Sequence, residues 1–193
     1  MDALFATGSA RCFEMGRENI AALQRFFEAN PEYALAVEGE PPGAHAAAEE
    51  YDSLPPPEWP LGRKWMLAFR DHDENMVAMA DVLSDLFVPG VWHVGLFIVA
   101  TRLHGGGMAY ELYDALESWM KGGGAQWARL GVVAGNARAE KFWERLGYVE
   151  VRRRLGVQMG RRTHDVRVMV KPLAGGRFAQ YLSLVARDRP DKT

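Results

Sequence analysis

Apolar residues along the chain follow two different periods, and the change between them marks the expected elements. Residues 91–99 and 127–133 are almost continuously apolar, which is typical of strands buried on both faces. Over 108–120 the apolar residues recur every three or four positions, which predicts an amphipathic helix, and Asn136 is placed to cap a second helix. The stripe of the first helix consists of Met108, Leu112, Leu116 and Met120. This order of elements predicts a βαβα unit over residues 91–148.

The segments on either side of this unit carry shorter signals. Before it we expect a short strand within 3–12, a helix over 17–29, an extended segment at 33–37, a helix over 44–51 and strands over 65–69 and 76–82. Residues 71–75 are turn formers that join the last two strands. Residues 53–62 hold four prolines and predict a loop, which either borders a binding pocket or is only a rigid link. After the unit we expect a hairpin of strands 149–157 and 165–171, then a helix over 178–187.

The strand at 91–99 carries one titratable side chain, His93. Strict alternation gives one face with His93, Gly95, Phe97 and Val99, and another with Trp92, Val94, Leu96 and Ile98. Both faces are mainly apolar, so the strand is expected at the centre of the sheet. His93 is then either a core histidine satisfied by a backbone carbonyl or a group available for proton transfer near neutral pH.

Composition sets the class of protein. A chain of 193 residues with 48% hydrophobic and 25% charged residues is long enough for one globular domain, expected over residues 1–193. Its one cysteine, Cys12, cannot form an internal disulfide, and no secretory leader pattern is present. No apolar run approaches the roughly 18 residues that span a bilayer. We therefore expect a soluble cytoplasmic protein with no membrane partner and no metal site.

Charge is spread unevenly over the chain. Residues 1–90 carry 16 acidic and 6 basic side chains and so a net charge of minus ten, while residues 149–193 carry plus seven. A surface lined by one sign of charge concentrates ligands of the opposite sign. The acidic half either favours a cationic ligand or only solvates exposed helix faces.

The junction between the central strand and the following helix is rich in glycine. Gly105, Gly106 and Gly107 stand directly before the helix that begins near Met108. Such a turn directs free backbone N–H groups and the positive end of the helix dipole to one point. The sequence therefore predicts a phosphate-binding site at this point.

Three blocks in this order resemble the GNAT superfamily of N-acetyltransferases. They are the apolar strand, the turn His104-Gly-Gly-Gly107-Met-Ala109, and the helix Asn136-x-x-Ala139-x-x-Phe142-Trp143-x-x-x-Gly147-Tyr148. A second register of the turn, Arg102-Leu-His-Gly105-Gly-Gly107, also fits the family pattern, but the first better preserves the spacing from the strand. The first register puts His104 where the family usually has glutamine or arginine.

The resemblance implies a mixed α/β fold, with antiparallel N-terminal strands, a βαβα core that binds acetyl-CoA over 91–148, and a closing hairpin. Residues 1–90 and 149–193 would form the acceptor side. The implied acetyl-CoA contacts are Phe97, Ile98, Val99, His104, Gly105, Gly106, Gly107, Met108, Ala109, Asn136, Ala139 and Trp143. The backbone amide near Val99 would face the thioester oxygen. His93 holds the place of a general base, which is glutamate in histone acetyltransferases and histidine in serotonin N-acetyltransferase.

The implied activity is transfer of an acetyl group to a primary amine of a small, cationic molecule or a peptide, in a ternary complex. Trp143 departs from the family, whose tyrosine protonates the leaving thiolate, and Tyr110, Tyr113 and Tyr148 are the candidate substitutes. Two alternatives stay open: a non-catalytic acyl-CoA sensor, and an RNA-directed acetyltransferase. Residues 152–154 and 161–162 are arginines that either bind an anion such as the CoA 3′-phosphate or guard an exposed sheet edge. We expect no nucleic-acid partner, and the chain either acts alone or forms a homodimer.

Overall fold

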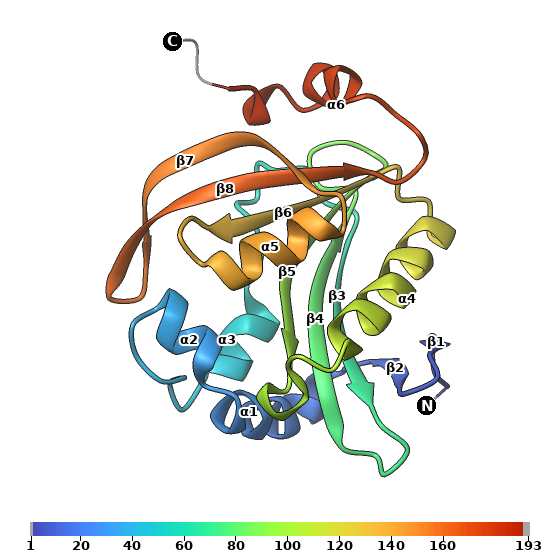
Figure 1. Cartoon of the computed structure of the whole chain (residues 1–193), viewed down its shortest axis with the longest axis vertical. Coiled ribbons are helices and arrows are strands. Elements are labelled where there is room, and N and C mark those ends of the chain that lie inside the picture. Colours follow the sequence, from blue (N-terminus) through green and yellow to red (C-terminus); the bar gives the residue numbers. More distant parts are fainter. Residues whose placement is uncertain (1, 191–193) are drawn as a thin grey trace.

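The computed structural model describes residues 2–190, whose strands form one sheet in the order β1-β2-β3-β4-β5-β6-β8-β7 (Figure 1). The strands are β1 (Phe5–Ala6), β2 (Arg11–Glu14), β3 (Arg63–Arg70), β4 (Met76–Ser84), β5 (Val91–Val99), β6 (Trp127–Val133), β7 (Val149–Met159) and β8 (Arg162–Pro172). All neighbours are antiparallel except β5 and β6, which are parallel. The predicted mixed α/β fold with a closing hairpin is confirmed.

Six α-helices and three 3-10 turns connect the strands within the described residues. The helices are α1 (Ile20–Ala29), α2 (Glu32–Val37), α3 (Ala46–Asp52), α4 (Met108–Gly122), α5 (Ala137–Arg145) and α6 (Phe178–Leu184). The turns are η1 (Arg17–Asn19), η2 (Thr101–Leu103) and η3 (Ala186–Asp188). No helix of residues 2–190 has the length and apolar character to cross a membrane. In the same part of the chain, no group of three or more acidic, histidine or cysteine side chains is placed to hold a metal ion.

The segment 33–37 was expected to be extended, and that prediction is wrong, because it forms helix α2. Pro31 precedes the helix at φ −74° and ψ −7°, a conformation that suits a helix start. Ala34 and Val37 lie three residues apart and are both buried, as one face of a helix requires. A six-residue helix shows too little periodicity to be recognised beside Pro31.

Helices cover both faces of the sheet, with α4 and α5 on one face and α1 and α3 on the other. On the first face, Leu112, Tyr113 and Leu116 of α4 are fully buried against the strands. On the second, Leu23 and Phe27 of α1 pack on the strands together with α3. The β5 strand at the centre contributes to both apolar layers.

A β-bulge in β5 overturns the strict alternation expected for this strand. The register with β4 passes from the pair Asp81–Leu96 to the pair Val82–Val94, so Gly95 is an extra residue on β5. The shift moves every later side chain to the other face. Phe97 therefore joins Val94 in the layer under α4, although strict alternation put the two on opposite faces. The opposite layer contains Leu96, Ile98 and Ala100.

The parallel pairing of β5 with β6 is short and opens into a gap. It joins Val91–Val94 to Trp127–Leu130 and ends there. Beyond that point β5 continues beside β4, whereas β6 continues beside β8. In Figure 1, β6, β8 and β7 run across the direction of β3, β4 and β5, so the two halves of the sheet diverge.

The C-terminal segment, predicted as a helix over 178–187, forms α6 and then η3, and it packs at one end of the sheet. Tyr181 of α6 is fully buried and its hydroxyl donates to Asp188 at 2.5 Å. Asp188 also accepts two hydrogen bonds from Arg129 of β6, at 2.7 and 3.0 Å. A buried arginine and a buried carboxylate thus neutralise each other and fix the segment to the sheet.

Candidate active site

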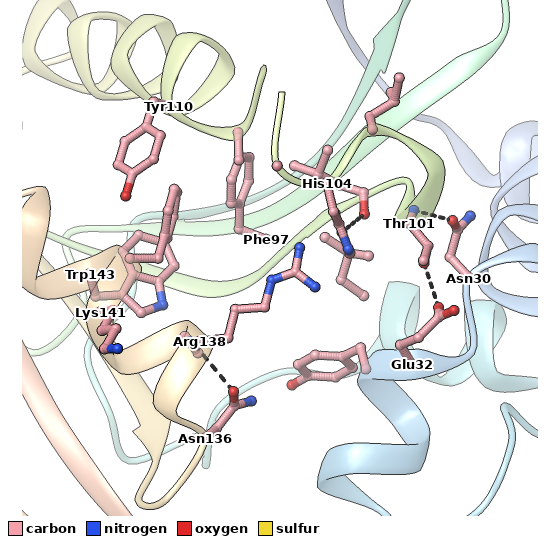
Figure 2. A pocket seen from close by; sticks show the side chains of 18 of the residues that line it. Asn30, Glu32, Phe97, Thr101, His104, Tyr110, Asn136, Arg138, Lys141 and Trp143 are labelled. Atoms are coloured by element: carbon pink, nitrogen blue, oxygen red, sulfur yellow. Dashed lines mark hydrogen bonds between the residues drawn. The ribbon is translucent and has the colours of Figure 1, made fainter. Parts of the chain in front are cut away.

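A cleft of about 610 Å³ lies where β5 and β6 diverge, and we call it the strand-gap cleft. β5 forms one wall, and the loop from Thr101 with the start of α4 forms the next. Helix α5 provides the opposite wall, and the segment around α2 closes the remaining side (Figure 2). The twelve predicted cofactor contacts include ten that line this cleft: Phe97, Ile98, Val99, His104, Gly105, Gly107, Ala109, Asn136, Ala139 and Trp143. Gly106 and Met108 lie in the same turn but do not line it.

The glycine turn has the geometry of an anion cradle. Gly105 and Gly107 adopt φ of 86° and 85°, a region that favours glycine. A Cβ built on either one would meet no protein atom within 4 Å, so the space in front of the turn is open. The backbone N–H groups of residues 105–109 have no protein acceptor within residues 2–190, and they stand at the N-terminus of the 15-residue helix α4. These donors fit a phosphate group.

The edge of β5 that faces the gap presents backbone groups. Ala100 donates its N–H to Val77 of β4, so Ala100 and alternate residues before it turn their backbone toward β4. By this alternation Phe97 and Val99 turn theirs toward the gap, where β6 no longer pairs. His104 confirms the direction, because its Nε2 lies 2.8 Å from the Val99 oxygen. His104 thus holds the carbonyl of Val99 and leaves the Val99 N–H for a ligand.

Three cations of α5 line the cleft, and the sequence analysis missed them. Arg138, Lys141 and Arg145 are spaced three and four residues apart, so they share one helix face. Figure 2 shows Arg138 extending between His104 and Asn136. The helical spacing of these three cations is visible in the sequence and could have identified them. The arginines that were considered instead, 152–154 and 161–162, do not line this cleft.

Those other arginines lie on the closing hairpin. Strand β7 is the last strand of the sheet, so its outer edge is unpaired within the described part of the chain. Arg153 pairs with Glu150 at 3.1 Å, and Arg161 pairs with Glu40 at 2.8 Å. Arg153 is thus placed as a charged guard of the exposed edge, whereas Arg161 lies in the hairpin turn and contacts the segment after α2.

Asn136 has the capping role that the sequence suggested, and Trp143 packs on the core. The Oδ1 of Asn136 accepts a hydrogen bond from the Ala139 N–H at 3.2 Å and so caps α5. Trp143 is 9% exposed and packs edge-on against Tyr113 at 4.9 Å between ring centroids. Its ring separates the aromatic core from the cleft.

The three tyrosines considered as proton donors are not equivalent. The hydroxyls of Tyr113 and Tyr148 hydrogen-bond to each other in the core, and burial raises the pKa of each above the ordinary value of 10.0. Neither lines the strand-gap cleft. Tyr110 does line it and stands against Phe142, with ring centroids 4.9 Å apart (Figure 2). Tyr110 is therefore the one of the three that can reach a ligand in the cleft.

His93, the predicted base, lies outside the strand-gap cleft and lines a second pocket of about 320 Å³. Its Nδ1 is 3.0 Å from the Arg129 oxygen and 3.3 Å from Arg129 Nη1. Burial, and then the positive charge of Arg129, lower the pKa of His93 from 6.5 to about 3. A ring of that pKa is neutral at pH 7 but a weak proton acceptor. The assignment of His93 as the base stays a prediction.

The second pocket lies beside the start of the β5–β6 gap. It is lined by Glu50, Ser53, Leu54, Pro55, Trp59, Asp81, Leu83, Leu86, His93, Gly95, Arg129 and Arg154. Ser53, Pro55 and Trp59 belong to the proline-rich loop, so that loop borders a pocket and is not only a link. A small cavity of about 60 Å³ lies between the two sites, because Ile98 lines both it and the cleft, and Glu50 lines both it and the second pocket.

Comparisons with known proteins agree with this geometry. The chain is similar to an acetyltransferase from Thermus thermophilus, with 14% identity and a TM-score of 0.66 over 89% of this chain and 99% of that one. It is similar to the ribosomal-protein-S18-alanine N-acetyltransferase of Escherichia coli, with 15% identity and a TM-score of 0.62 over 87% and 96%. Spermidine N-acetyltransferase from Vibrio cholerae, in complex with CoA and spermine, gives 15% identity and a TM-score of 0.66 over 86% and 96%.

At such low identity these structures establish the fold and not the acceptor. A comparison with curated proteins finds no match. The model of the acetyltransferase (GNAT) family, however, matches residues 20–148, about two thirds of the chain. That range contains the central strand, the glycine turn and the helix capped by Asn136. The chain therefore belongs to the GNAT family of acetyltransferases.

Proposed function

We propose that the protein transfers the acetyl group of acetyl-CoA to a primary amine of a small cationic molecule or a peptide. The observation that carries the proposal is the gap between β5 and β6, which ends in a glycine turn with free N–H groups. A thioester with a long polar arm and a diphosphate needs such a site, with backbone partners along its length and anion donors at one end.

The cleft residues divide into three groups by the part of acetyl-CoA that they would hold. The N–H groups of Gly105, Gly107 and Ala109 would bind the diphosphate, and Arg138 and Lys141 would add charge. The free backbone groups of Phe97 and Val99 would bind the pantetheine arm in the way that they would pair with a neighbouring strand. The Val99 N–H would also stabilise the oxygen of the thioester as negative charge develops on it. When bound, acetyl-CoA supplies the activated acyl group.

Direct transfer between the two substrates is favoured over an acyl-enzyme. Cys12 is the only thiol of the sequence, and it is 1% exposed within the core layer under α4. Burial raises the pKa of Cys12 well above its ordinary value, so the reactive thiolate is not available. The leaving thiolate of CoA would take its proton from Tyr110 or from water, since Trp143 has no acidic proton to give.

The acceptor site lies on the acidic side of β5. Glu50 and Asp81 line the second pocket, and Glu38 lines the small cavity between that pocket and the cleft. A cationic amine suits these carboxylates. The similar structures include one enzyme that takes a polyamine and one that takes a protein alanine, so both a small molecule and a peptide are retained.

Calorimetric titration with acetyl-CoA and with CoA tests the first half of the proposal. Thiol release across spermidine, short peptides, amino acids and aminoglycosides tests the second. Binding with amine-dependent thiol release is expected. Binding without release by any amine would favour an acyl-CoA sensor, and absence of binding would overturn the proposal.

A further inference from the structure

Asp81 on β4 is a buried carboxylate with only one of its two oxygens paired. The residue is 6% exposed, and its Oδ1 has no hydrogen-bond donor within the part of the chain that the structure describes. Its other oxygen, Oδ2, pairs with Lys64 of β3 at 3.2 Å. Leaving a buried carboxylate oxygen without a donor is costly, so this arrangement indicates a missing ligand or proton.

The position of Asp81 is at the start of the gap. Its Oδ2 would be 3.3 Å from a Cβ added to Gly95, the bulged residue of β5. Gly95 directly follows Val94, the last residue of β5 that pairs with β6. Val99 lies four positions after Gly95, a distance of roughly 13 Å at about 3.3 Å per residue. The carboxylate therefore lies at the opposite end of the gap from the glycine turn.

A second carboxylate, Glu50 of α3, lines the same pocket as Asp81. Burial is the largest cause that raises the pKa of Asp81, from 3.8 to about 7, while the charge of Lys64 opposes this shift and the charge of Glu50 adds to it. A proton on Asp81 or a donor from a ligand would satisfy its unpaired Oδ1.

The other charges around the pocket leave this pair with a net negative charge. Lys64 offsets one carboxylate, and its ammonium is also held by the backbone oxygens of Glu50 and Ser53. Arg129 is neutralised by Asp188, His93 is neutral, and Arg154 lies exposed at the edge of the pocket. When both carboxyls are ionised, Lys64 leaves one unit of negative charge on the pair itself, which one ammonium group can balance.

We propose that the Asp81–Glu50 pair binds the ammonium group of the acceptor and that Asp81 takes the proton that this group must lose. The inference rests on the proposed function and assigns the acceptor side of the same site. The acceptor is a primary amine that enters through the second pocket, gives its proton to Asp81 beside Gly95, and then moves along the gap to the thioester at Val99. His93 then contributes a neutral ring to the wall of the pocket.

The proton balance of the transfer is complete with these groups. The ammonium gives one proton to the Asp81 carboxylate and becomes an amine with a free electron pair. The amine nitrogen bonds to the acyl carbon as the bond from that carbon to sulfur breaks. The nitrogen loses its second proton as the amide forms, and the thiolate takes one proton to become the thiol. Asp81 finally releases its proton to water.

The test measures amine binding separately from turnover. Protein saturated with CoA is titrated calorimetrically with spermidine, trialanine and butylamine, and the amine that binds best is then used with acetyl-CoA. Asp81→Asn should weaken amine binding at least tenfold and lower the rate at pH 7 about a hundredfold, without changing the affinity for acetyl-CoA. The matched control is Asp73→Asn, which removes an equal charge from an exposed hairpin turn and should change neither quantity.

The pH profile separates a proton acceptor from a merely structural carboxylate. The wild-type rate should fall as pH drops below about 7, and Asp81→Asn should abolish this limb. Glu50→Gln should move the limb to lower pH, because it removes the negative charge that raises the Asp81 pKa. His93→Gln should keep the limb. The Glu50→Gln result also stands if Asp81→Asn does not fold.

Each outcome has a distinct meaning. Lack of acetyl-CoA binding by the wild type overturns the proposed function itself. This inference alone is overturned if the wild type binds and turns over acetyl-CoA but Asp81→Asn keeps both the amine affinity and the fall in rate at low pH. Loss of the limb in His93→Gln, or failure of every amine to bind the CoA-loaded protein, also overturns it.

Discussion

The strand-gap cleft and the second pocket lie along the same strand, β5, but are built from different parts of the chain. The cleft presents mainly backbone, at Phe97, Val99 and the glycine turn, all within a short stretch of sequence. The second pocket presents side chains that come from α3, β4, β5, β6 and β7. A site made of backbone can be recognised from local sequence. A site made of distant side chains depends on the whole fold.

The two regions also differ in whether their charged groups are exposed or desolvated. The cleft offers N–H donors and the cations of α5 to an anionic ligand, and these groups are open to solvent when no ligand is present. In the second pocket Asp81 is buried and His93 is half-buried, and desolvation raises the pKa of the carboxyl, lowers the pKa of the ring and so favours the neutral form of each. Variants in each region should therefore fail in different ways.

The largest effect is expected for stability as a function of pH in Asp81→Asn. Because the pKa of Asp81 is about 7 in the folded state and 3.8 is its ordinary value, the folded state binds this proton more tightly. Its contribution to the free energy of unfolding is fully present below about pH 4 and is lost as pH rises through about 7, by roughly 4 kcal/mol. Asp81→Asn should remove this dependence in chemical denaturation at several pH values.

His93 makes the comparison with the wild type essential. Its pKa is lowered to about 3, so its contribution is present above pH 6.5 and is lost as pH falls toward 3. The two groups thus act in opposite directions over one pH range, and only the difference between variant and wild type isolates Asp81. Equal slopes in wild type, Asp81→Asn and the exposed control Asp73→Asn would show that Asp81 does not titrate in this range.

The next largest effect is expected for Gly107→Ala in the cleft. Alanine at φ 85° is strained by roughly 1–2 kcal/mol, and relief of that strain would turn the N–H groups away from the diphosphate. Calorimetry should show about a hundredfold weaker binding of acetyl-CoA, which is about 2.7 kcal/mol.

Gly124→Ala is the matched control for this glycine. Gly124 follows the other end of α4 at φ 100°, and an added Cβ there also meets no atom within 4 Å. The control should lose similar stability and keep its affinity for acetyl-CoA. Equal affinity losses in the two variants would mean that strain, and not the direction of the donors, sets the effect.

The same contrast explains how much of the molecule could be predicted from sequence. Strands 91–99 and 127–133 were located to the residue, because continuous apolar runs between turn formers leave little choice. The turn at Gly105–Gly107 and the cap at Asn136 are local features and were also found. The bulge at Gly95 was missed, since it depends on the register between β4 and β5, and no single strand shows it.

The residues that were overlooked share a dependence on tertiary contacts. Asp81 lies in an apolar stretch and was taken only as part of a strand, because its importance comes from Lys64 and Glu50, which are distant in sequence. Arg138 and Lys141 are different, since their helical spacing was visible. They were missed because the arginine runs at 152–154 and 161–162 led us to expect an anion site on the closing hairpin.

A smaller effect is expected when these α5 cations are removed. Arg138→Ala and Lys141→Ala should each weaken acetyl-CoA binding by about tenfold or less, because both side chains line a cleft open to solvent and their charges are screened by salt. The loss should shrink as salt is raised. Arg25→Ala, which removes an exposed cation from α1 outside the cleft, should bind as the wild type does. A loss in Arg25→Ala equal to that in Arg138→Ala would point to net charge rather than to contact.

The smallest effect is expected at Asn136, where a structural and a binding role can be separated. Asn136→Ala removes the hydrogen bond to the Ala139 N–H and should cost about 1 kcal/mol in the free energy of unfolding. Asn136→Ser keeps a capping oxygen and should recover most of that stability. If Asn136 only caps α5, its serine variant should also bind acetyl-CoA normally. Normal stability with weaker binding in Asn136→Ser would instead show that the longer amide contacts the ligand. Asn136 would then have a binding role in addition to its capping role.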